Sequence, residues 1–184
     1  GSYENRIRFP LEIVRRIREK AGKEFILIFR LSMLDLVKEG SKLEEIIILG
    51  KKLEEAGVNI INTGIGWHEA RVPTIATMVP RKTFCFVTKR LKKELKVPLI
   101  CTNRINTPEL ANELLEDGYA DMVSMARPFL ADPDFIKKAI EIQWPSQLIF
   151  LSNLIFILIK EKIFFSWIIR PNIFNTIVRI IFAF

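Results

Sequence analysis

The sequence contains only two cysteines and one histidine among its 184 residues. Cys85 and Cys101 form no C-x-x-C pair and lack the spacing of zinc or iron–sulfur ligands, so we expect no metal site and no disulfide-stapled small fold. We expect both thiols to be buried or half-buried in a reducing compartment. Residues 1–6 contain no apolar run, so we expect no secretory signal there and a cytoplasmic location.

Interleaved aromatic residues are missing from the basic runs of the chain, whose formal net charge is +7. Segments such as 15–18 and 89–93 are typical of helices whose long cationic side chains form solvated faces. No nucleic-acid fold signature accompanies them, and we therefore expect no nucleic-acid partner.

Glycine and aspartate are absent from residues 142–184, and Glu161 is the only acid there. Ile, Phe and Leu dominate this stretch, in apolar runs at 148–159 and 163–169 that the charged residues 160–162 separate. Neither run reaches the ~20 apolar residues that a membrane span needs. A distorted span that crosses the charged break is kept as an alternative. Two interpretations of this apolar, helical tail remain: a membrane-associating hairpin, or the product of a shifted or unrelated reading frame.

Helix-type and strand-type patterns alternate up to about residue 135. Apolar runs typical of buried strands lie at 25–29, 58–64, 98–102 and 120–125. Helical spacing or helix caps occupy 5–21, 43–56, 83–95 and 107–118, and a short helix starts at 132. This alternation predicts an α/β fold with a parallel sheet, either in a (β/α)8 barrel or in a doubly wound arrangement.

No strand leads into a glycine-rich dinucleotide fingerprint, because Glu69 stands where the third glycine of the motif begun by Gly64 and Gly66 should be. An arginine instead follows three of the strands, at Arg30, Arg104 and Arg127. In a barrel the loops after the strands build one active site, and a guanidinium suits a phosphate or the electron-rich edge of a flavin. The alternative for each arginine is an exposed loop residue or the partner of a nearby acid.

The single histidine, His68, follows the second strand beside Trp67 and Glu69. Its imidazole, with an ordinary pKa of about 6.5, suits proton transfer near neutral pH. The competing interpretations are a structural or exposed histidine, an ion pair between Glu69 and Arg71, and a packing role for Trp67.

Four segments make the pattern recognisable: 29–35, 61–71, 102–106 and 122–129. They resemble the bacterial NADPH-dependent 2,4-dienoyl-CoA reductases, members of the Old Yellow Enzyme group, or NADH:flavin oxidoreductase family. The likeness runs from Gly1 to Ile140 and is most specific between Gly64 and Pro73. It implies a partial TIM barrel, strands five to eight with their helices, in residues 1–140, followed by an unrelated tail in 141–184.

The resemblance also implies the roles of single residues. FMN would lie at the barrel mouth, with Arg30 at the pyrimidine side of its ring system. The cofactor's phosphate would be held by Asn103, Arg104, Ala126 and Arg127. His68 would act in catalysis with a tyrosine as the proton-donating side of the reaction. An acyl-CoA pocket would be lined by Glu69, Ala70, Arg71 and Val72.

The expected activity is the FMN-dependent reduction of 2,4-dienoyl-CoA in unsaturated fatty acid β-oxidation, with NADPH as the electron source. The chain departs from the family pattern, because it lacks counterparts of the first four strands, the active-site tyrosine, the FAD and NADPH domains and the 4Fe–4S cysteines. A fragment of this kind is expected to be a remnant with little activity alone. The alternative is a non-catalytic or membrane-associated half-barrel that binds an anionic ligand and self-associates through its open edges.

Overall fold

The computed structural model describes residues 1–66, 70–71, 74 and 76–141. It divides into two compact units, Gly1–Met125 and Ala126–Phe184. The predicted tail lies outside the described residues, so the expectations for it stay predictions.

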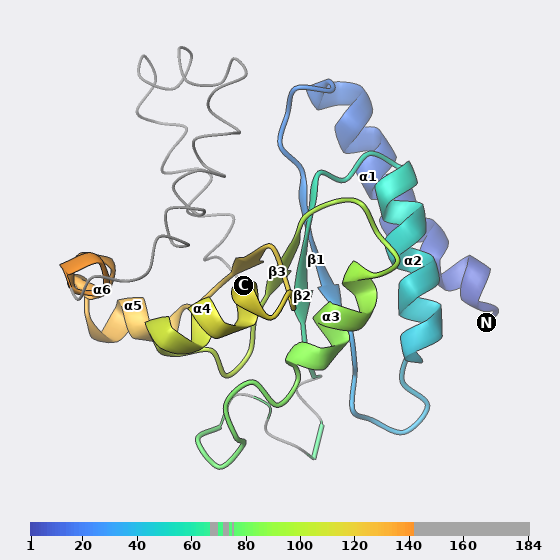
Figure 1. Ribbon diagram of the computed structural model, residues 1–184. Coiled ribbons are helices and arrows are strands. Elements are labelled where there is room, and N and C mark those ends of the chain that lie inside the picture. Colours follow the sequence, from blue (N-terminus) through green and yellow to red (C-terminus); the bar gives the residue numbers. More distant parts are fainter. Residues whose placement is uncertain (67–69, 72–73, 75, 142–184) are drawn as a thin grey trace. The chain divides into compact units, whose positions relative to one another are not determined.

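Helices and strands alternate through the first unit (Figure 1). In chain order they are α1 (Tyr3–Ala21), β1 (Ile28–Ser32), α2 (Leu43–Glu55), β2 (Ile60–Gly64), α3 (Cys85–Lys92), β3 (Leu99–Cys101), α4 (Pro108–Glu116) and β4 (Met122–Val123). The four strands form one parallel sheet in the order β1-β2-β3-β4, which confirms the predicted α/β fold. Neighbours in sequence are neighbours in the sheet, as in successive βα units of a barrel.

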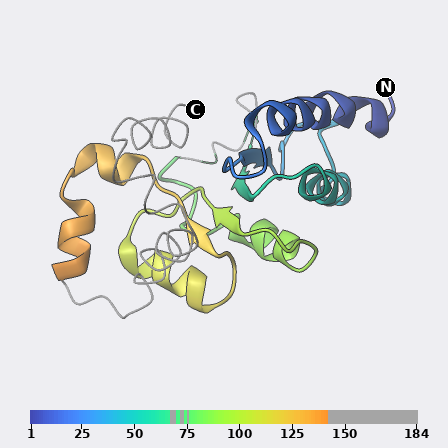
Figure 2. The same cartoon turned by 90° about the horizontal axis from the view of Figure 1, so that it is seen from above.

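One face of the sheet packs against the helices, which follow one another around the strands in Figure 2. Leu31, Ile61 and Leu99 project from this face into the main hydrophobic cluster. The helices contribute Val14, Leu53 and Leu91, each at most 1% exposed. Because side chains alternate along a strand, the residues between these positions point to the opposite face, here called the inner face.

The bounds of the first strand correct the sequence-based expectation. A strand buried on both faces was expected at 25–29, but β1 runs from Ile28 to Ser32 and only Leu31 is fully buried. Phe25 is 46% exposed and precedes the strand. The apolar run at 25–29 indicated that a strand lies nearby. The residues that form the strand are those that pair with β2, Ile28–Ser32.

Helix ends follow the local chemistry of the chain. Thr107 caps α4 by accepting a hydrogen bond from the backbone amide of Leu110 at 3.4 Å, and Pro108 opens the helix as predicted. Gly22 ends α1 with φ of 79°, a conformation that suits glycine. The second unit holds the short helices α5 (Arg127–Ala131) and α6 (Phe135–Glu141). Sequence patterns predicted only the later of these two.

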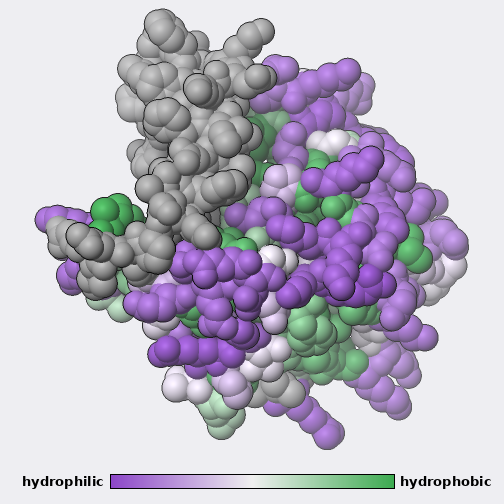
Figure 3. Space-filling view, in the orientation of Figure 1, coloured by the Kyte–Doolittle hydropathy of each residue, from purple (hydrophilic) through white to green (hydrophobic). Residues whose placement is uncertain are grey.

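Charged side chains form the solvated surface of the outer helices, as expected from the basic runs. Figure 3 shows hydrophilic residues over most of α1 and α2 on the visible face. Arg16 pairs with Glu12 at 2.7 Å on α1, and Arg90 pairs with Glu94 at 2.7 Å beside α3. These exposed pairs contribute little to stability individually.

Candidate functional site

The carboxyl ends of the parallel strands meet at one edge of the sheet. Ser32 ends β1, Gly64 ends β2, and residues 102–104 follow β3. Arg30 was expected to follow its strand but lies in the middle of β1, because the strand runs on to Ser32; its guanidinium reaches the strand end at Gly64. In α/β folds this edge is where loops assemble binding and catalytic groups. The candidate site is therefore built from these residues and the loops that follow them.

Arg30 is the exposed cation of this edge. Its guanidinium lies against the backbone of Gly64, where an added Cβ would stand 3.5 Å from Nη2 and 3.6 Å from Nε. These are ordinary van der Waals distances, so the guanidinium packs directly over the end of β2. Within the described part of the chain, the Arg30 guanidinium makes no hydrogen bond and no ion pair. Its planar set of donors is therefore available to an anion or an electron-rich ring edge.

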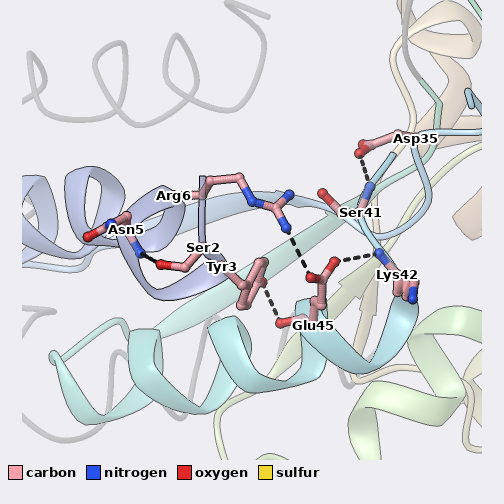
Figure 4. A network of polar contacts seen from close by, with 8 residues as sticks. All are labelled: Ser2, Tyr3, Asn5, Arg6, Asp35, Ser41, Lys42 and Glu45. Carbon is pink, nitrogen blue, oxygen red and sulfur yellow. Dashed lines mark hydrogen bonds and ion pairs between the residues drawn. The ribbon is translucent and has the colours of Figure 1, made fainter. Parts of the chain in front are cut away.

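A polar network fixes the loop that follows β1 (Figure 4). Asp35 accepts a hydrogen bond from the Ser32 hydroxyl at 3.2 Å and another from the Ser41 backbone amide at 2.9 Å. At the start of α2, the Glu45 carboxylate accepts from Arg6 and from the Lys42 backbone amide, both at 3.0 Å. The loop beside Arg30 is thus fixed internally by Asp35 and joined to α2 through Glu45, which in turn binds α1 through Arg6.

Tyr3 belongs to the same network, because its hydroxyl donates to the backbone carbonyl of Glu45. Burial raises the pKa of Tyr3 to about 12, and the Glu45 carboxylate adds to the rise. The phenol is therefore held in its neutral, hydrogen-bond-donating form at physiological pH.

The loop after β2 turns sharply at Gly66, which has φ of 86°. A Cβ there would stand 2.9 Å from Cγ2 of Thr74, so only glycine fits. The Gly66 amide donates to the Leu34 carbonyl at 2.7 Å. The Ile65 carbonyl accepts from Thr74 at 3.2 Å. The glycines that began an incomplete dinucleotide motif therefore serve the close packing of this loop.

Arg104 differs from Arg30 in its surroundings. It is 8% exposed, and its Nε donates to the Val79 carbonyl at 2.7 Å while Nη2 donates to the Thr77 carbonyl at 3.3 Å. These bonds tie the loop after β3 to the segment that follows Thr74. Asn103 and Arg104 both have positive φ, 71° and 56°, and the Asn103 side chain donates to the Ile65 carbonyl at 3.5 Å. The structure gives Arg104 a loop-holding role, and phosphate binding by this pair stays a prediction.

The remaining predicted residues fall into three groups. Ala126 and Arg127 belong to the second unit, where the Ala126 carbonyl accepts from the amides of Phe129 at 3.1 Å and Leu130 at 3.2 Å. Ala70 is half-buried and Arg71 is exposed. The third group, His68, Glu69 and Val72, lies outside the described residues. The roles expected of all these residues stay predictions.

Asn62 was missed at the sequence level. It lies in the middle of β2 as the register partner of Arg30, and it is 7% exposed. Its Oδ1 is buried and accepts no hydrogen bond within the described chain. The signal was present as an amide side chain directly after two isoleucines in a predicted buried strand.

Both cysteines are buried, as expected, and their side chains contact one another. Both are free and 0% exposed, although they are distant in the sequence. A hydrogen bond to Cys101, together with burial, raises the pKa of the Cys85 thiol above its ordinary range. Cys85 is therefore held as an unreactive, protonated thiol.

Two kinds of feature are absent from residues 1–66, 70–71, 74 and 76–141. No helix there combines the length and apolar character that crossing a membrane requires. Likewise, no group of three or more His, Cys, Asp or Glu side chains in these ranges could hold a metal ion.

Comparison with known proteins gives consistent matches over the same part of the chain. The NADH:flavin oxidoreductase / NADH oxidase family matches residues 1–144. A metal reductase from Desulforamulus reducens is 37% identical over 139 residues, which are 76% of this chain and 21% of the relative. An NADH oxidase from Thermoanaerobacter brockii is 38% identical over 143 residues, 77% of this chain and 22% of the relative.

A solved structure supports the same assignment. A 2-naphthoyl-CoA reductase in complex with 2-naphthoyl-CoA superposes with a TM-score of 0.74 at 34% identity, over 77% of this chain and 22% of that one. The chain therefore spans about a fifth of the length of these relatives. On the strength of the match to residues 1–144, the chain belongs to the NADH:flavin oxidoreductase / NADH oxidase family.

Proposed function

We propose that this chain forms the FMN-binding half-barrel, strands five to eight, of an NADPH-dependent 2,4-dienoyl-CoA reductase. The observation that carries the proposal is the exposed guanidinium of Arg30, which lies over Gly64 at the carboxyl edge without a partner in the described chain. Family membership supports a flavin oxidoreductase. The name of the 2-naphthoyl-CoA reductase supports a CoA thioester substrate.

The described residues fit FMN at the ring side. The pyrimidine edge of a flavin is electron-rich and gains negative charge on reduction, and a guanidinium stabilises such charge. Arg30 would hold this edge, and Asn103, Arg104, Ala126 and Arg127 would hold the phosphate. When bound, FMN supplies the hydride for reduction of a conjugated double bond.

The chain's own residues would complete the reaction around the cofactor. His68 would donate the proton that the reduced substrate takes up. Glu69, Ala70, Arg71 and Val72 would line the acyl-CoA pocket. NADPH, FAD and a 4Fe–4S cluster would act through other parts of the enzyme, in the cytoplasm.

FMN binding tests the proposal directly. The full chain is titrated into FMN and the quenching of flavin fluorescence is followed, for the wild type and for Arg30→Ala. Loss of a charge-assisted hydrogen bond of about 1.5–3 kcal/mol predicts a Kd roughly 10 to 150 times weaker. Arg8→Ala is the matched control, because Arg8 is an exposed arginine on α1. If the wild type leaves FMN fluorescence unchanged, or if both variants bind like the wild type, the proposal is wrong.

A second candidate function is a non-catalytic half-barrel that self-associates. In the described residues β1 and β4 each pair on one side only, and open parallel edges accept further strands. This candidate predicts a defined dimer by light scattering that binds no FMN. A monomeric chain would exclude it.

A further inference from the structure

Two buried thiols lie together where α3 packs against the end of β3. Cys85 is the first residue of α3, and Cys101 is the last residue of β3. Both are free and 0% exposed, and both belong to one hydrophobic cluster. The flavin site proposed above uses neither of them.

The geometry of α3 brings the two sulfur atoms within reach of each other. Thr88 lies one turn after Cys85 on the buried face of the helix, and its hydroxyl donates to the Cys101 sulfur at 3.5 Å. Residues three positions apart on a helix are neighbours, with about 5–6 Å between their Cβ atoms. Cys85 therefore faces the same end of β3 as Thr88 does. A hydrogen bond between the two thiols agrees with this placement.

Contacts on both sides of the pair already hold its two segments together. The Lys82 amide, three residues before Cys85, donates to the carbonyl of Arg104, three residues after Cys101, at 3.4 Å. The bond from Thr88 to Cys101 lies on the other side. A disulfide needs two Cβ atoms about 3.5–4.5 Å apart, which neighbouring segments can supply with a small adjustment. Its formation needs no cavity, because it joins two side chains that are already in contact.

The start of α3 gives a reagent access to Cys85. In the packed state the hydrogen bond to Cys101 and burial raise the pKa of the Cys85 thiol above its ordinary range, which keeps it protonated. Phe84, at the N-cap of α3, makes no side-chain capping hydrogen bond. Helix ends open more readily than helix centres, and a missing cap favours opening. Opening of the first turn exposes Cys85, so its reaction is expected to be slow and to follow this opening.

We propose that Cys85 and Cys101 are a latent disulfide pair, which an organic disulfide such as glutathione disulfide oxidises to a covalent link between α3 and β3. The Cys85 thiolate attacks the reagent, which forms a mixed disulfide and releases one thiolate. The Cys101 thiolate then attacks the Cys85 sulfur, which forms the protein disulfide and releases a second thiolate. The pair loses two electrons and two protons, and the reagent takes them up as two thiols.

The link would act on the loop after β3. Cys101 directly precedes residues 102–104 of the candidate site, so oxidation would tie this loop covalently to the start of α3. A link between residues 85 and 101 closes a loop of about 15 residues, which restricts the unfolded chain. The proposal does not depend on FMN binding.

Oxidation of the reduced full chain tests the proposal. The chain is incubated with glutathione disulfide without denaturant, and its intact mass and its non-reduced peptides are measured by mass spectrometry. We expect the loss of two hydrogen atoms, a peptide that joins Cys85 to Cys101, and no attached glutathione. The linked chain is expected to melt roughly 5–10 °C above the reduced chain, and dithiothreitol is expected to reverse this rise.

Cys85→Ser and Cys101→Ser are the matched controls, because each keeps one thiol and a side chain of similar size. Each variant is expected to gain at most one glutathione and to show no rise in melting temperature after the same treatment. The peptide map of the wild type gives its result without any variant.

Three results would overturn the proposal. One is a native wild type that keeps both thiols while the same reagent oxidises the urea-unfolded chain. Another is a wild type that carries two glutathiones in place of the link. The third is a linked chain that melts at or below the temperature of the reduced chain, since the bond would then not fit the native packing.

Discussion

Replacement of Thr63 by valine tests the polar network that holds β2 and β3 together beneath the candidate site. The Thr63 hydroxyl donates to the Ile100 carbonyl at 2.9 Å and lies 2.8 Å from the Thr88 hydroxyl. Because each hydroxyl has one proton and that of Thr63 goes to Ile100, Thr88 is the donor at the shared contact. All three groups are buried.

The structure gives the size of the effect. Thr63→Val keeps the shape of the side chain but removes two neutral hydrogen bonds, each worth about 0.5–1.5 kcal/mol. The Thr88 proton then has only the Cys101 sulfur, 3.5 Å away. We expect the free energy of unfolding to fall by about 2 kcal/mol, or roughly 4–8 °C in Tm for a chain of this size.

Urea unfolding followed by circular dichroism measures this change. Thr88→Val is expected to cost less, because Thr63 keeps its bond to Ile100. The double variant is expected to cost about 1 kcal/mol less than the sum of the single variants, since both remove the same shared bond. Unchanged stability in Thr63→Val, or strict additivity, would refute this account.

Three further predictions follow from single side chains. Gly66→Ala is expected to destabilise the chain by at least about 1 kcal/mol in urea unfolding, because of its positive φ and the 2.9 Å approach to Thr74; the same stability as the wild type would contradict this. Arg18→Lys is expected to lower the thermal midpoint, because one ammonium cannot replace a guanidinium that donates to the carbonyls of Gly22, Lys23, Phe25 and Gly57 and to the Asn59 side chain; an unchanged midpoint would exclude this role. The pKa of Tyr3 is raised from 10.0 to about 12, so its stabilising contribution is present below pH 10 and is lost as the pH rises toward 12. Tyrosinate absorbance in a Tyr119→Phe background checks this, and a midpoint near pH 10 would contradict it.

The alternation of elements was predictable because it is written in local patterns. Apolar runs and helical spacing located each strand and helix of the first unit to within a few residues. Side-chain caps such as Thr107 act on neighbouring residues, so the start of α4 was predictable as well. In α1 the local pattern did not identify the buried face of the helix. Phe9, Ile13 and Ile17 have helical spacing but are 73%, 41% and 36% exposed. The buried stripe is Ile7, Leu11 and Val14.

The candidate site was predictable in part. Strand ends with recurring arginines pointed to the carboxyl edge, and a family resemblance named Arg30 and Arg104 as cofactor ligands. Two arginines in equivalent sequence positions nevertheless have different surroundings, because one is exposed over Gly64 and the other is bonded to the carbonyls of Thr77 and Val79. Hydrogen-bond partners that are 25 and 27 positions away in the chain leave no local signal.

The sequence alone determined what short-range interactions control: which segments become helices or strands, where helices begin, and the parallel order that βα alternation favours. It also carried the family resemblance, because that resides in residue identity. The tertiary structure decided which face of α1 is buried, that Cys85 meets Cys101, and that Asn62 stands beside Arg30 with an unsatisfied acceptor. These three features depend on how segments that are distant in the sequence pair and pack. No local pattern connects the residues that share the free energy of burial there.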